Sequence, residues 1–360
     1  MRSPLRFAVA AAALLVGACA DESTAPANAT NLSPLSADAN VVSSVLDSPT
    51  AASLMAMGPS MDLAMGGSAL VGSAIGLRAT DLQSAKVAGR QLYQRLQGGA
   101  APNTVADVIP QALTGRTLVF DPSFQRYVLS DRTGAPASGV RFVLYTINPL
   151  TNRPAEPLTE VGYADITRTA TSTSISGRVE AFSGTTAPVK VMDYTATLTG
   201  VVVSPQVSVV GFAANGADRL EFTMTSSINV AQQQITINNQ ATVPTQSILV
   251  AVNVALSLSE NSEAITMDGR IESPDGTLRI SGGTNASGAG SYTVTVNGST
   301  FATITFTPNA AEPTVVDAAG RPLTAEQVEA LRQIFVMFGS AFEVFDGLSA
   351  PIGTVIGFAI

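Results

Sequence analysis

Histidine and tryptophan are both absent from this chain of 360 residues, cysteine occurs once, and only 13% of the residues are charged. Without histidine there is no imidazole to act as a general base, to complete a Ser-His-Asp triad or to bind a metal. A single cysteine excludes an internal disulfide and a cysteine-rich zinc site. We therefore expect no metal, no cofactor and no catalytic residue, and so a protein that is not an enzyme.

The charge and hydropathy further limit the classes of protein to which this chain can belong. The formal net charge is −8 and the pI is near 4.6, whereas a nucleic-acid binder would carry a basic surface, so we expect no nucleic-acid partner. The residues are 46% hydrophobic and the mean hydropathy is +0.29, which is typical of a folded chain with a large core.

The first residues have the layout of an export signal. Arg2 and Arg6 are basic, and residues 7–16 are apolar. A membrane-spanning helix needs about 20 apolar residues, so this run is too short to span and suits the apolar region of a signal peptide.

The apolar run ends in Val16-Gly17-Ala18-Cys19, which resembles the lipobox of bacterial lipoproteins. The resemblance implies a signal peptide over residues 1–18, cleavage before Cys19 and attachment of acyl chains such as palmitate to that cysteine. Two or more acyl chains anchor a protein stably in a bilayer. Ala20 follows the cysteine, and by analogy this implies the outer membrane of the cell envelope, on its periplasmic or surface face. An ordinary secretory signal is the alternative.

The composition then changes along the chain. Residues 19–40 are rich in Ser, Thr, Pro and Asn without apolar periodicity, which predicts a flexible tether. We expect a single α+β domain over 41–360, with 41–100 helical, 101–310 antiparallel β, and a C-terminal helix and tail over 311–360. The Met-rich stretch 41–77 is either core filler or an apolar flap over a ligand cavity.

Two amphipathic helices are expected. The first begins at Thr80, which forms a capping box with Gln83, and ends at Gly98-Gly99. The second begins with the capping box of Thr324 and Gln327 and should stop between Gly347 and Pro351. Its apolar stripe recurs at spacings of three and four and consists of Val328, Leu331, Phe335, Phe338, Phe342 and Phe345.

Between the helices, apolar and polar residues alternate with period 2, which predicts about ten antiparallel strands with one apolar and one polar face. Asn-Gly and Asp-Gly pairs mark hairpin turns between them. The apolar positions include Met192, Tyr194, Ala196 and Leu198, then Leu220, Phe222, Met224 and Ile228, and then Ile265, Met267 and Ile271.

Few residues suggest chemistry. The lysines beyond the signal, Lys86 and Lys190, belong to no Ser-Lys motif. The acids on strands should all fall on the polar face: Glu180, Asp193, Glu221, Asp268 and Glu272. The densest polar and aromatic cluster could be a binding site, or a cross-strand ion pair beside a stiff loop: Arg141, Tyr145, Arg153, Glu160, Tyr163 and Asp165.

The fold expected from these patterns is a large, curved antiparallel sheet whose apolar face is covered by the N- and C-terminal helices. This arrangement resembles the half-barrel lipid carriers of bacterial envelopes, such as lipoprotein chaperones and mycobacterial lipid carriers. The resemblance implies a hydrophobic small molecule bound between sheet and helices, with membrane attachment through Cys19. The alternative is a non-enzymatic interaction or structural module with a solid core. The sequence identifies neither a ligand-binding residue nor a protein partner.

Overall fold

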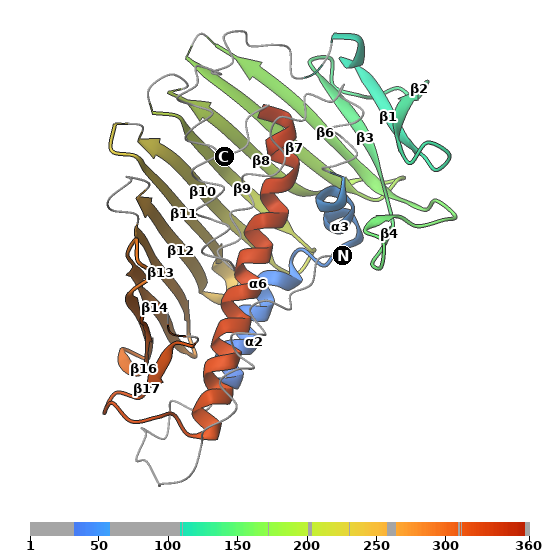
Figure 1. Ribbon diagram of the computed structural model, residues 1–360. Helices are drawn as coiled ribbons and strands as arrows, with labels where there is room; N and C mark the ends of the chain where they lie inside the picture. The colour runs from blue at the N-terminus through green and yellow to red at the C-terminus, as the bar shows by residue number, and fades with distance from the viewer. Residues whose placement is uncertain are drawn as a thin grey trace.

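The computed structural model describes residues 32–57, 109, 111–171, 173–200, 204–229, 231–257, 264–308, 310 and 312–356. Its main feature is a 15-stranded sheet in the order β17-β16-β15-β14-β13-β12-β11-β10-β9-β8-β7-β6-β3-β1-β2. Figure 1 shows helix α6 running across one face of this sheet, with α2 and α3 beside it. The predicted combination of a large antiparallel sheet with a few helices is confirmed.

The strands are β1 (Arg116–Asp121), β2 (Arg126–Ser130), β3 (Gly139–Tyr145), β6 (Glu160–Ala170), β7 (Ser174–Ser183), β8 (Val189–Thr199), β9 (Gln206–Ala214), β10 (Arg219–Asn229), β11 (Gln234–Val243), β12 (Ile248–Ser257), β13 (Ala264–Ser273), β14 (Gly276–Thr284), β15 (Gly290–Val296), β16 (Ser299–Phe306) and β17 (Thr314–Val316). A separate small hairpin consists of β4 (Ile147–Asn148) and β5 (Arg153–Pro154). Short 3-10 helices are η2 (Gln111–Leu113) and η3 (Pro244–Gln246).

The two faces of the sheet differ as the alternation predicts. On β8, Met192, Tyr194, Ala196 and Leu198 are all buried, and we call the face that carries them the inner face. The opposite, outer face carries Asp193 and the threonines between these residues, all half-buried. Helices α3 and α6 contact β7 and β8, so the helices cover the inner face.

The strand count of about ten was too low. The additional strands are short, and a strand of two to six residues, such as β17 or β4, gives too little alternation to be detected. The pairing also departs from successive hairpins at one place: β3 pairs in parallel with β1, because β2 lies outside β1 at the edge of the sheet.

Among the described residues before β1, two α-helices are present: α2 (Ser33–Ser44) and α3 (Pro49–Ala56). The tether predicted to extend to residue 40 is therefore wrong from Ser33 onward. Leu32, Leu35, Ala39 and Val42 are buried at helical spacings, and α2 packs against α6 and β11–β13. The buried residues within this helix are Leu35, Ala39 and Val42, spread among Ser, Asp and Asn, which is why its periodicity was missed.

Helix α3 is hydrogen-bonded to the sheet as well as packed on it. The Ser48 hydroxyl caps its N-terminus by accepting from the Ala51 N–H at 3.2 Å. The Thr50 hydroxyl donates to the Val161 carbonyl at 3.3 Å, and the backbone N–H of Tyr145 donates to the Ser53 hydroxyl at 3.0 Å. These bonds fix α3 at the point where β3 meets β6.

Helix α6 (Ala325–Ile356) begins as predicted and ends later than predicted. The capping box is confirmed: the Thr324 N–H donates to Gln327 Oε1 at 2.8 Å, and the Gln327 N–H donates to Thr324 Oγ1 at 3.3 Å. Gly347 does not stop the helix. A Cβ at this position would lie 2.5 Å from Met55 Sδ, so the glycine allows α3 to approach α6 closely.

The interface between α6 and the sheet is filled by side chains. From the predicted stripe, Leu331, Phe338 and Phe345 are buried, whereas Val328, Phe335 and Phe342 are partly buried. The ring of Phe338 lies over Gly269 of β13, where a Cβ would come within 2.8 Å of its Cε1 atom. The other buried side chains of this face are Ala330, Ile334, Met337, Ala341, Val344 and Leu348.

Several predictions concern residues outside the described ranges: the signal peptide and Cys19, the helix beginning at Thr80, Lys86, and the methionines at 61 and 65. Within the described ranges, no helix combines the length and hydropathy that crossing a bilayer requires.

Candidate functional site

The cluster predicted between Arg141 and Asp165 divides into separate contacts. Arg141 on β3 and Asp165 on β6 are directly opposite each other in the register, and two hydrogen bonds of 2.7 Å join the guanidinium to the carboxylate. The guanidinium also lies 3.7 Å from the ring centroid of Tyr163, which stacks on Phe182 at 4.8 Å. Of the two readings left open, this geometry matches the cross-strand ion pair.

The remaining cluster residues lie apart from that pair. Glu160 accepts two hydrogen bonds from Arg132, at 2.9 and 2.5 Å, and this bonding lowers the pKa of the Glu160 carboxyl. Burial, followed by the charge of Glu160, raises the pKa of Tyr145. Arg153 donates to the side chain of Gln125 in the neighbouring hairpin. The six predicted residues therefore do not form one site.

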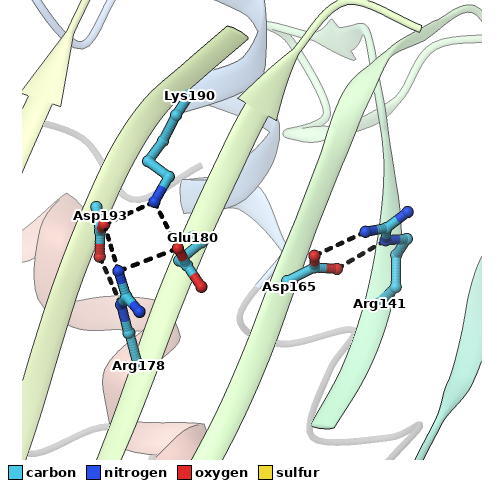
Figure 2. A network of polar contacts seen from close by, with 6 residues as sticks. All are labelled: Arg141, Asp165, Arg178, Glu180, Lys190 and Asp193. Carbon is cyan, nitrogen blue, oxygen red and sulfur yellow. Dashed lines mark hydrogen bonds and ion pairs between the residues drawn. The ribbon is translucent and has the colours of Figure 1, made fainter. Parts of the chain in front are cut away.

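The structure instead assembles a ring of four charges on the outer face, next to the Arg141–Asp165 pair (Figure 2). Arg178 and Glu180 lie on β7, and Lys190 and Asp193 lie on β8. Arg178 contacts Asp193 at 2.7 Å and Glu180 at 3.1 Å. Lys190 contacts Glu180 at 2.5 Å and Asp193 at 2.9 Å. Each carboxylate is thus paired with both cations.

These pairings set the charge state of the ring. Hydrogen bonds to Glu180 and Asp193 raise the pKa of Lys190, so its amine stays protonated and is not a nucleophile at neutral pH. Burial raises the pKa of Asp193, but the hydrogen bonds from Arg178 and Lys190 outweigh it and leave this pKa below its ordinary value. An acid held as an anion in this way is not a proton donor near pH 7.

The other acids predicted for the polar face are also ion-paired. Glu221 pairs with Arg219, Glu272 with Arg270, and Asp268 with Arg279. The alternation in the sequence identifies these acids but not their partners, such as Arg178, nor does it identify Arg132, the partner of Glu160. The signal that would find Arg178 is cross-strand register, which pairs Arg178 with Thr195 and places it diagonally to Asp193.

A second part of the outer face is almost free of charge and contains an open groove of about 360 Å³. It crosses β11 to β14. Asn238, Asn253, Asp268 and Ser281 lie opposite one another in successive strand pairs along it. The groove is lined by these four residues together with Thr236, Val254, Ala255, Thr266, Met267 and Gly282.

Among the described residues, no group of three or more acidic, cysteine or histidine side chains is arranged to hold a metal ion. Comparison of the chain with protein-family models, with curated proteins and with solved structures found no match.

Proposed function

We propose that the protein is a non-enzymatic interaction module, anchored in the bacterial cell envelope by acyl chains on Cys19, that presents the outer face of its sheet to a partner. The single observation that carries this proposal is the close packing of α6 against the sheet and against α3. Phe338 packs against Gly269, and Met55 packs against Gly347, at distances that leave no room for one additional carbon at either glycine.

The filled interface favours this function over a lipid carrier. A carrier needs an apolar cavity, and small-molecule pockets have volumes of about 300–1,000 Å³. In the part of the chain that the structure describes, the groove of about 360 Å³ lies instead on the outer face and is lined mainly by Thr, Asn, Ser and Asp. The groove therefore offers hydroxyl, amide and carboxylate groups to a partner.

The charge pairing argues against catalysis on the outer face. Asp193 and Glu160 are both held as anions by cationic partners, and Lys190 is held as a cation. A general acid or a nucleophile would need the opposite shift in pKa. These pairs instead keep an exposed β-surface soluble and in register.

Native mass spectrometry and organic extraction test the proposal. The chain from residue 20 onward, expressed in a bacterium, should be purified without detergent, and its extract analysed for lipid. We expect a mass equal to that of the polypeptide and no stoichiometric lipid. One co-purifying lipid per chain, lost in a Phe338→Ala variant and retained in a Val336→Ala variant, would overturn the proposal in favour of the carrier. Val336 is the matched control because its side chain is 55% exposed on the same helix.

A further inference from the structure

We infer that the groove across β11–β14 binds a neutral glycan chain, an inference that rests on the proposed function and names the partner of the outer face. The groove lies within two rows of residues that run across the strands. One row consists of Thr225, Asn238, Asn253, Asp268, Ser281, Thr293 and Thr303. The other consists of Ser227, Thr236, Ala255, Thr266, Gly283, Ser291 and Thr305.

The charge of these rows selects a neutral partner. Asp268 is the one ionisable residue in them, and Arg279 neutralises it from the next strand. Apart from the Asp268–Arg279 pair, the ion pairs on this face lie toward the other ends of the strands, around Arg178, Glu221 and Glu272. A phosphate, an acidic polymer or a basic peptide would find no complementary charge along the rows.

The side chains of the rows can bind hydroxyl groups. A planar amide offers two donors and an acceptor, and a hydroxyl offers one donor and two acceptor positions. Asn238 and Asn253 are exposed and directly opposite each other. Within the described part of the chain, the side chains of Asn253, Ser281 and Thr266 make no hydrogen bond to protein, so their capacity is available to a ligand. This contrasts with the acids of the outer face named above, each of which is ion-paired.

The shape of the groove and its lack of large exposed hydrophobic side chains suit a sugar chain more than a folded protein. Ala255 and Gly283 keep one row low, so that a polymer can lie across the strands. The large exposed hydrophobic side chains of the described residues lie elsewhere, at positions 124, 129, 150, 189, 210 and 336. A protein partner would need such an anchor.

The length of the rows also fits a polymer. With neighbouring strands about 4.8 Å apart, the rows from β10 to β16 extend over roughly 30 Å. No aromatic side chain occurs in either row, so each sugar unit is held by hydrogen bonds without ring stacking. We therefore expect weak binding of short oligosaccharides, strengthened as the chain becomes longer.

Saturation-transfer difference NMR on the full chain in mild detergent tests this inference, because the method detects weak ligands. The neutral probes are chitohexaose and maltohexaose, and the acidic comparison is a hexamer of galacturonic acid. We expect saturable binding of at least one neutral hexamer and none of the acidic one. In the double variant Asn238→Ala/Asn253→Ala, the affinity should fall about tenfold or more, because each lost hydrogen bond contributes about 1 kcal/mol.

The matched control is Thr195→Ala/Thr223→Ala, which removes polar atoms from the same outer face, one position along the strands from the rows. This control should bind like the unmodified chain. Absence of binding to both neutral hexamers, preference for the acidic hexamer, or equal losses in the two double variants would each overturn the inference. None of these results depends on lipid content, so failure of this inference and failure of the proposed function are separate outcomes.

Discussion

The contact between Phe338 and Gly269 gives the sharpest test of how α6 is held on the sheet. A Cβ added at Gly269 would lie 2.8 Å from Cε1 and 3.2 Å from Cδ1 of the Phe338 ring, and the ring is 4% exposed. Gly269→Ala should therefore overpack the interface, which costs about 1–3 kcal/mol. Replacing a strand glycine by alanine recovers about 0.5–1 kcal/mol, so the net loss should be about 0–2.5 kcal/mol.

The same substitution should change sign when the ring is absent. Phe338→Ala alone should cost about 3–5 kcal/mol, because it removes a buried aromatic side chain and leaves a cavity. In that background the new methyl group at Gly269 meets no ring, and only the gain of about 0.5–1 kcal/mol remains. The coupling energy between the two substitutions should thus be about 1–3 kcal/mol.

Urea unfolding monitored by far-UV circular dichroism measures all four members of this cycle, since the chain has no tryptophan to report by fluorescence. Val336→Ala is the control on the exposed side of α6 and should stay within about 0.5 kcal/mol of the parent chain. If Gly269→Ala destabilises both backgrounds equally, the ring does not occupy the space above the glycine, and the account of the interface is wrong.

Four further predictions follow from the anchor, α3, the interior and the charge ring. Cys19→Ser should abolish incorporation of labelled palmitate into the full chain; labelling that persists would exclude Cys19 as the acylation site. Ser53→Ala should lower the free energy of unfolding by about 1–3 kcal/mol, because the buried N–H of Tyr145 loses its acceptor. Ser48→Ala, at the half-buried cap of the same helix, should cost about 1 kcal/mol. Tyr194→Phe should be neutral or stabilising by up to about 1 kcal/mol, because the buried Tyr194 hydroxyl has no hydrogen-bond partner; a marked loss would reveal water or ligand inside. Because the pKa of Asp193 is lowered in the folded state, its contribution to stability should be complete above roughly pH 4 and should be lost as the pH falls through the pKa of the folded state. The urea midpoint should therefore fall less steeply between neutral and acid pH in Asp193→Asn than in the parent chain.

The local features that the sequence predicted well are those encoded within a few residues. Asn297 and Gly298 both have positive φ, 51° and 76°, as the predicted two-residue hairpin turn requires. The capping box at Thr324 forms as predicted, because its two residues are neighbours on one helical turn. The faces of β8, β10 and β13 follow from the alternation alone.

The features that were missed depend on contacts between distant segments. Gly347 looked like a helix stop because nothing near it in the sequence shows that Met55 packs there. The parallel pairing of β1 with β3 is set by β2 taking the edge position, which no local pattern encodes. The same limit applies to Arg178, whose role depends on the register between β7 and β8.

A single β-bulge between β15 and β16 decides which residues of β16 lie on the outer face, and the alternation in the sequence does not predict it. From the Asn297-Gly298 turn, regular pairing would place Thr293 opposite Ala302 and so oppose a polar residue to a buried one. A bulge between Val294 and Thr295 shifts the register and places Thr293 opposite Thr303. Its trace in the sequence is the apolar pair Phe301-Ala302, whose members are both buried although consecutive strand residues should face opposite ways. Because the bulge accommodates one extra residue in β16, the two rows on the outer face continue onto this strand. A substitution that removed the bulge would move Thr303 and Thr305 from the outer face to the inner face.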